Sequence, residues 1–133
     1  MLSTPKNGWC EFRLGEFRGT PSYLTNVPMD VLDMCLDYQK KGTGICYFDE
    51  EGPDFVLIFA HGEVFIIASR DEQPSLYQFN KITPEKLIKE IVNDFNEQFE
   101  QWIDEFIISE TSEEENQQRK EIMRKLIEVQ ARA

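Results

Sequence analysis

The chain has 133 residues, of which 41% are hydrophobic and 12% aromatic, so its composition is that of one folded domain and not of a disordered acidic tail. Its 25 acidic and 14 basic residues give a net charge of −11. This balance argues against nucleic-acid and membrane partners, which require clustered Lys and Arg, and it favours a basic protein as the partner.

The first part of the chain is predicted to form a strand followed by a helix. Hydrophobic and charged residues alternate over residues 8–17, which is typical of a half-buried strand. A helix is expected over residues 28–41, because Pro28 suits its first turn and Gly42 follows two lysines as a stop signal.

A β-meander is expected in the middle of the chain, with four strands over residues 44–48, 54–60, 63–69 and 75–79. His61-Gly62 fits a two-residue hairpin turn, since Gly accepts a positive φ and His tolerates it better than most residues. Residues 55–59 are apolar at every position. Both faces of that strand must therefore be covered, the second one either by this chain or by another subunit.

Two helices are predicted at the C-terminal end. Thr83 and Pro84 provide the cap and the first turn of a long helix over residues 84–108, whose apolar residues recur at a spacing of three and four. A capping box at residues 112–115 starts a final helix with few apolar residues. The segment 111–133 therefore either packs at the edge of the domain or forms a partner-facing arm.

This order of elements predicts a single α+β domain over residues 1–133, since segregated helices fit it better than repeated βαβ units. A mostly antiparallel sheet of about five strands is expected to be packed by two to three helices. The helices at 28–41 and 84–108 are expected on one face of that sheet, with the final helix at an edge.

Cysteine usage and the N-terminal residues indicate a cytoplasmic protein. Cys10, Cys35 and Cys46 are odd in number and lack C-x-x-C spacing, which argues against a disulfide framework and against zinc binding. The first six residues lack the apolar run of a signal peptide. The longest apolar run, residues 55–60, is far too short to span a bilayer.

The chain carries no catalytic signature. His61 is the only histidine and is assigned to a turn, so no nucleophile–histidine pair is indicated. The acidic segment 49–54 lacks the EF-hand register, and residues 42–44 lack the helix and the lysine that a phosphate-binding loop needs. We therefore predict that the protein is not an enzyme and has no catalytic residue, cofactor or metal site.

The acidic surface is the remaining candidate site. Three aspartates lie at i, i+3 and i+7 on one stripe of the helix at 28–41, and three more acids follow in the turn after residue 48. Residues 84–110 hold eight acids against two lysines, but their apolar stripe is committed to the core, so the more compact groups are favoured. A solubilising surface is the alternative for any one group. The predicted partner-binding residues are Asp30, Asp33, Asp37, Asp49, Glu50 and Glu51.

Three features carry a resemblance to a known family over about residues 8–108: the strand at Trp9-Cys10-Glu11-Phe12, the hairpin at His61-Gly62 and the acid-rich helices. In these features the chain resembles the bacterial immunity proteins that neutralise secreted toxins, including toxins of contact-dependent growth inhibition systems. The resemblance is one of architecture and composition, and it assigns a function to no individual residue. It implies a cytosolic, one-to-one inhibitor of a basic toxin domain, often a nuclease, whose active site or substrate groove is blocked by carboxylates in place of phosphates.

Two other functions stay open from the sequence. An acidic, dimeric secretion chaperone or adaptor would use the two-sided apolar strands to hold an unfolded segment of its client. A small-ligand-binding domain would use an aromatic pocket between sheet and helix, although core packing explains the same aromatic residues. The choice between a monomer and a homodimer is also left open.

Overall fold

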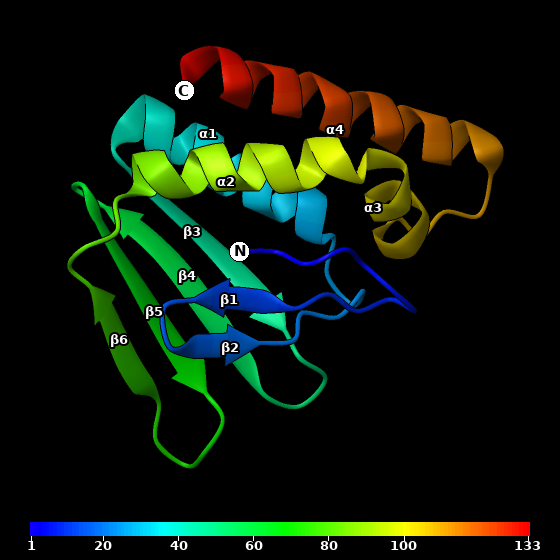
Figure 1. The fold of residues 1–133 in the computed structure, drawn as a ribbon. Coiled ribbons are helices and arrows are strands. Elements are labelled where there is room, and N and C mark those ends of the chain that lie inside the picture. The colour runs from blue at the N-terminus through cyan, green and yellow to red at the C-terminus, as the bar shows by residue number, and fades with distance from the viewer.

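A four-stranded antiparallel sheet is the base of the fold in the computed structural model, which describes residues 1–133. Its strands lie in the order β3 (Thr43–Asp49), β4 (Asp54–Ala60), β5 (Glu63–Ser69) and β6 (Ser75–Phe79) (Figure 1). The predicted meander is therefore confirmed. The hairpin turn is confirmed as well, because His61 and Gly62 have φ values of 51° and 81° and Ala60 pairs with Glu63.

A hairpin over residues 12–19 takes the place of the single strand that was expected over residues 8–17. Gly15, with a φ of 57°, turns the chain so that β1 (Phe12–Leu14) pairs with β2 (Phe17–Gly19) in a separate two-stranded sheet. The rings of Phe12 and Phe17 lie 5.1 and 5.0 Å from the ring of Phe55 on β4. The α+β class and the antiparallel pairing are confirmed, but the strands are divided between sheets of four and two, because the Gly15 turn reverses the chain.

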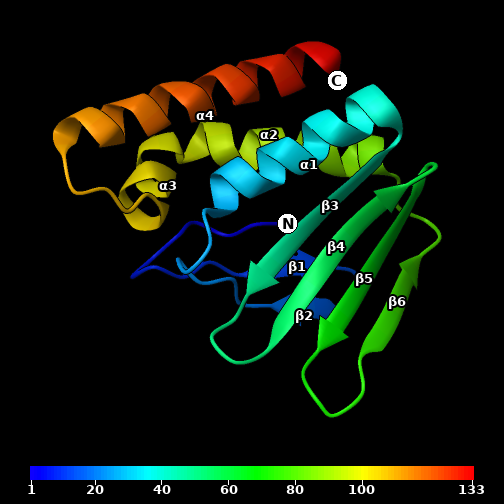
Figure 2. The same cartoon turned by 180° about the vertical axis from the view of Figure 1, so that it is seen from behind.

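The helices lie on the same side of the larger sheet as the β1–β2 hairpin (Figures 1 and 2). α1 (Val27–Lys41) packs directly on β3. Gly44 permits this close approach, because a Cβ atom there would collide with the carbonyl oxygen of Met34. α2 (Pro84–Glu97) lies beside α1 over this side of the sheet, and α3 (Phe99–Phe106) follows at the end of the helical layer, in contact with α1 and α2.

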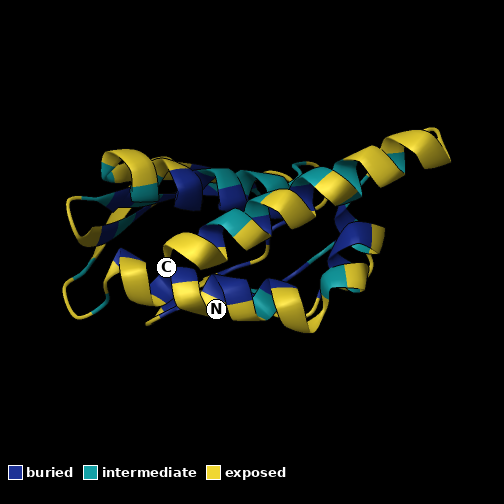
Figure 3. Cartoon of the chain, turned by 90° about the horizontal axis from the view of Figure 1, so that it is seen from above, coloured by how far each residue is buried: buried dark blue, intermediate teal, exposed yellow.

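α4 (Ser112–Arg132) lies across α1 and α2, in a layer farther from the sheet. It buries Ile122, Leu126 and Val129 against them, while most of its surface is exposed or intermediate, as Figure 3 shows from above. The segment 111–133 thus packs on the helical layer through a narrow apolar stripe. None of the four helices combines the length and the apolar character needed to cross a bilayer.

Local sequence signals set four of the eight helix ends. The Asn26 side chain accepts a hydrogen bond from the Met29 backbone N–H at the start of α1, and Gly42 ends that helix with a φ of 84°. Thr83 caps α2 through the Lys86 N–H, as predicted. The capping box of α4 begins one residue earlier than expected, because Thr111 rather than Ser112 accepts from the N3 backbone N–H.

The helix expected over residues 84–108 is interrupted at Gln98, whose φ and ψ are −132° and 40°. The interruption turns α3 back so that the Trp102 ring packs at 88° against the Phe95 ring, with centroids 5.0 Å apart. Trp102 Nε1 also donates to the Asp94 carbonyl oxygen at 3.3 Å. No Gly or Pro marks the break, so side-chain packing and not local propensity sets it.

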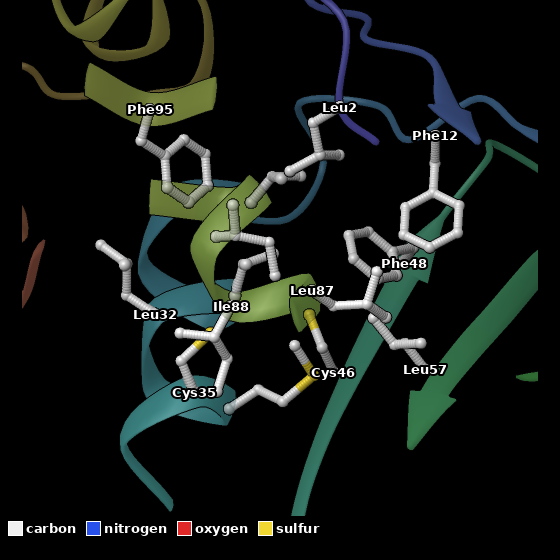
Figure 4. Packing of buried hydrophobic residues seen from close by; sticks show 14 of the residues in the cluster. Leu2, Phe12, Leu32, Cys35, Cys46, Phe48, Leu57, Leu87, Ile88 and Phe95 are labelled. Carbon is white, nitrogen blue, oxygen red and sulfur yellow. The ribbon is translucent and has the colours of Figure 1, made fainter. Parts of the chain in front are cut away.

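Thirty buried hydrophobic residues form one continuous core between the helices and the sheet. Figure 4 shows its centre, where Cys46 and Leu57 of the sheet face Leu87 and Ile88 of α2. A single core over the whole chain is the property of a single domain.

Candidate functional site

The two faces of the larger sheet differ in what covers them. Alternate residues of β3, β4 and β5 point toward the helices and are buried. The residues between them point to the opposite side, where no other element lies in front of the sheet (Figure 2). We term this uncovered side the open face. It carries seven large apolar residues: Ile45, Tyr47, Val56, Ile58, Phe65, Ile67 and Leu76.

The register of the strands brings these apolar residues into contact with one another. One cross-strand row passes through all four strands, with Tyr47, Val56, Ile67 and Leu76 as neighbours. Exposure is greatest on the two outer strands, at 64% for Ile45 and 69% for Leu76. Scattered exposed apolar residues are normal on a protein surface, but a contiguous group on one face indicates an interaction site.

Carboxylates border the open face at both ends. Asp49 and Asp54 lie opposite each other at one end, and Glu63 lies at the other. None of the four strands contains a Lys or Arg. The Tyr47 hydroxyl donates to Asp54 Oδ2 at 3.3 Å, and desolvation together with the nearby carboxylates raises the pKa of Tyr47. The open face therefore has an apolar centre and negatively charged ends.

Strand geometry gives the size of the open face. Four strands spaced ~4.8 Å apart, with seven residues at ~3.3 Å each in the longer ones, cover about 20 by 23 Å, or about 450 Å² in projection. The largest apolar patch on a typical monomer is ~300–600 Å² and is often functional. The open face falls within that range when its polar and acidic residues are included, and its apolar centre is smaller.

The three aspartates predicted on the first helix lie on the helical side of the sheet and not on the open face. Asp33 forms an ion pair with Lys125 Nζ of α4, so its charge is compensated within the chain. Asp30 is half-buried, and this burial, with the nearby charge of Asp33, raises its pKa. Asp37 is exposed. The three aspartates lie along one helix, but Lys125 of α4 pairs with Asp33 of this group.

The acids of the β3–β4 loop have separate roles. The Glu50 side chain is only 8% exposed; it accepts from Arg70 Nη2 at 3.0 Å and from the Thr20 backbone N–H at 2.8 Å. Asp49 accepts from the Glu51 backbone N–H at 2.6 Å, and Glu51 itself is exposed. Glu50 therefore fastens the loop to the β1–β2 hairpin and to Arg70.

Of the six predicted partner-binding residues, Asp49 lies at an end of the open face. The structure places the acids of α1 and those of the loop on different parts of the molecule (Figure 2). The other acids at the ends of the open face, Asp54 on β4 and Glu63 on β5, were not among the predicted residues. Their signal in the sequence was their position as the first residues of strands that are apolar on both faces.

The groups that could carry other chemistry are scattered. No three His, Cys, Asp or Glu side chains are grouped so that they could hold a metal ion. His61 is exposed in its turn. The cysteines are buried and free, and burial raises the pKa of Cys10 and Cys35 to about 12. Those thiols are protonated near neutral pH and are therefore weak nucleophiles.

The largest hollow in the surface, about 740 Å³, lies between the N-terminal segment, β2 and Arg70. Its lining is mostly polar and includes Lys6, Arg18 and the ion-paired Glu50 and Arg70. The aromatic rings that a ligand pocket between sheet and helix would require are packed against one another in the core.

Comparison with protein-family models, with curated proteins and with solved structures gives no match to this chain.

Proposed function

We propose that this chain is a non-enzymatic, cytoplasmic binding protein that docks a basic protein partner on the open face, as an immunity protein docks a toxin domain. The observation that carries the proposal is the apolar open face, which is bordered by carboxylates and contains no Lys or Arg. An apolar centre supplies most of the affinity of a protein interface, and charges at its border select the partner.

Area and charge favour a basic partner over two copies stacked face to face. Stable interfaces bury about 800 Å² per partner, which is more than the projected area of about 450 Å² of the open face. The area of the open face already includes its acidic ends, so a partner of standard size must cover Asp49, Asp54 and Glu63 and extend beyond them. A basic surface would form ion pairs there, whereas a stacked second copy would bring only further carboxylates from its own open face.

The test is capture of the partner from the native host with three tagged chains. These are the wild type, Ile45→Asp on the open face, and Ile127→Asp on α4. The two variants are matched, because Ile45 and Ile127 are 64% and 60% exposed and each gains the same charge. The wild type and Ile127→Asp are expected to retain one basic protein that Ile45→Asp loses, because a buried, unpaired carboxylate opposes docking.

The captured protein is then purified and titrated against the three chains by calorimetry. We also expect its expression to arrest bacterial growth and co-expression of the wild-type chain, but not of Ile45→Asp, to relieve the arrest. A basic partner that binds all three chains equally would refute the open face as the docking site. Capture of unfolded, non-basic clients would instead support the secretion-chaperone alternative.

A further inference from the structure

Strand β6 is an unpaired edge of the sheet. It pairs with β5 on one side only, and in both Figure 1 and Figure 2 nothing lies beyond it. In an antiparallel sheet, alternate residues of such a strand direct their N–H and C=O groups away from the neighbouring strand. The two-residue turn at His61-Gly62 makes Ala60 and Glu63 a hydrogen-bonded pair. The backbone groups of Val64, Ile66 and Ala68 on β5 therefore face β6 and pair with Phe79, Tyr77 and Ser75. The backbone N–H and C=O groups of Leu76 and Gln78 are then directed away from β5.

β6 lacks the features that protect sheet edges from pairing. Edge strands are usually protected by Lys, other charges, Pro or covering segments. The sequence of β6, Ser75 to Phe79, contains no charge and no Pro, and Ser75 through Gln78 are exposed. The other edge, β3, is occupied at one end, because the Ser22 N–H donates to the Asp49 carbonyl oxygen at 2.8 Å.

We propose that β6 is a homodimerisation strand, which pairs antiparallel with β6 of a second copy about a twofold axis through Tyr77. This register sets Leu76 opposite Gln78 of the second copy, and Ser75 opposite Phe79. The outward N–H and C=O groups of Leu76 and Gln78 then form four hydrogen bonds across the axis. The result is a continuous eight-stranded sheet, and such an isologous contact closes the assembly at two copies.

Charge complementarity identifies the second copy as the occupant. If this register is continued past the ends of β6, through the bend at residues 71–73 and the turn at residues 80–81, residues 71–73 of one copy come beside residues 81–83 of the other. Asp71 and Glu72 thereby approach Lys81 of the second copy twice in each dimer. All three side chains are exposed and none forms an ion pair within its own chain.

The dimer proposal is independent of the proposed function. A twofold axis perpendicular to the sheet leaves both open faces on the same side, so pairing through β6 covers neither of them. The dimer would present about 900 Å² of open face in projection, twice that of one chain. A monomeric protein could still bind a basic partner, and a β6 dimer could still lack one.

The dimer proposal is tested by measuring the mass of the purified chain from 1 to 500 µM with light scattering and sedimentation. Glu72→Lys and Lys81→Glu are each expected to raise the dimer dissociation constant about tenfold, because each change affects two symmetric surface ion pairs. The Glu72→Lys/Lys81→Glu double variant is expected to recover part of the lost affinity, because it restores the pair between positions 72 and 81 but leaves Asp71 beside a negative charge. Glu51→Lys and Lys89→Glu are the matched controls, since they make the same charge changes on the β3–β4 loop and on α2.

A second variant tests the backbone pairing. Gln78→Pro removes an N–H that faces away from β5, so it is expected to give a monomer with an unchanged circular dichroism spectrum. A wild-type chain that is monomeric at all concentrations would overturn the proposal. A dimer insensitive to Gln78→Pro and to both charge reversals would overturn it as well, because its interface would lie elsewhere.

Discussion

The open face should contribute little to the stability of the fold, and a matched pair of substitutions measures this. Leu57→Ala and Ile45→Ala each remove three carbon atoms, from adjacent strands but from opposite faces of the sheet. Leu57 is 0% exposed, so its truncation leaves a cavity in the core and should cost about 3 kcal/mol of unfolding free energy. Ile45 is 64% exposed, so only about a third of the ~2–3 kcal/mol for full burial is at stake, and we expect a loss below about 1 kcal/mol.

Urea unfolding measures both losses. The far-UV circular dichroism signal reports on the whole fold, and tryptophan fluorescence reports on Trp102 in the helical layer together with the partly buried Trp9 in the N-terminal segment. With a slope of about 2 kcal/mol per M for a domain of this size, Leu57→Ala should lower the transition midpoint by about 1.5 M. Ile45→Ala should lower it by less than about 0.5 M, with an unchanged slope. The measurements are made at 1 µM, where self-association contributes least.

An equal loss for the two variants would refute this reasoning. It would mean that Ile45 is buried in solution, and the open face would then be covered by another part of the chain or by a stable oligomer. Repeating the series at 100 µM distinguishes these causes, because only an oligomer makes the midpoint depend on protein concentration.

Three further outcomes follow from particular contacts. Asp30→Asn should raise the melting temperature at pH 7, because burial raises the pKa of Asp30 and the fold therefore disfavours its charged form. The contribution of Asp30 to stability is fully present below its usual pKa of 3.8 and is lost as the pH rises through the raised pKa of the folded state. The gain in melting temperature should therefore shrink in scans from pH 7 to pH 4. Gly44→Ala should lower the unfolding free energy by about 2 kcal/mol or more in the same urea assay, since the new methyl group meets the Met34 carbonyl of α1. Gly52→Ala is the control, because nothing lies within 4 Å of the new methyl group and only the backbone strain at a φ of 125° is added. The three buried thiols should not react with Ellman's reagent in the native protein at pH 8, and all three should react in 6 M guanidinium. A reaction in the native protein would show that Cys10, Cys35 or Cys46 becomes exposed to solvent.

Local chemistry made most of the elements predictable. Helix α1 begins at an Asn cap and a Pro and ends at a Gly in the left-handed region, and each of these signals acts within a few residues. The meander was predictable because His61-Gly62 closes a hairpin that fixes the register of β4 against β5. In these segments the sequence and the structure agree, because no distant contact competes with the local preference.

The differences arise where distant contacts decide. The interruption at Gln98 has no local signal, since it depends on Trp102 reaching Phe95 in the core. The acidic stripe of α1 was predicted as a surface, but Lys125 from α4 neutralises Asp33 across 92 residues of sequence. Periodicity assigns a residue to one face of its own helix, but it does not show which other element packs on that face.

The candidate site depends partly on local sequence signals and partly on contacts between distant segments. Apolar residues on both faces of residues 55–59 indicate that the second face needs a cover, and that much can be inferred from the sequence. Which cover it has depends on where the helices pack. All four lie on the inner side, and β3 adds Ile45 and Tyr47 to the same outer face. The open face is therefore a property of the tertiary arrangement and not of any one strand.

The centre and the ends of the open face should affect binding kinetics differently. Asp54→Asn keeps an oxygen for the Tyr47 hydroxyl but removes a charge, so it should slow association with the basic partner about two- to fivefold at low salt and have no effect at 0.5 M salt. Ile45→Ala should leave association unchanged and speed dissociation at either salt concentration, because apolar contacts form after encounter. Glu97→Gln on α2 is the control for Asp54→Asn, since it removes an exposed charge on the helical side. If Asp54→Asn and Glu97→Gln slow association equally, the net charge of the chain and not the border of the open face steers the partner.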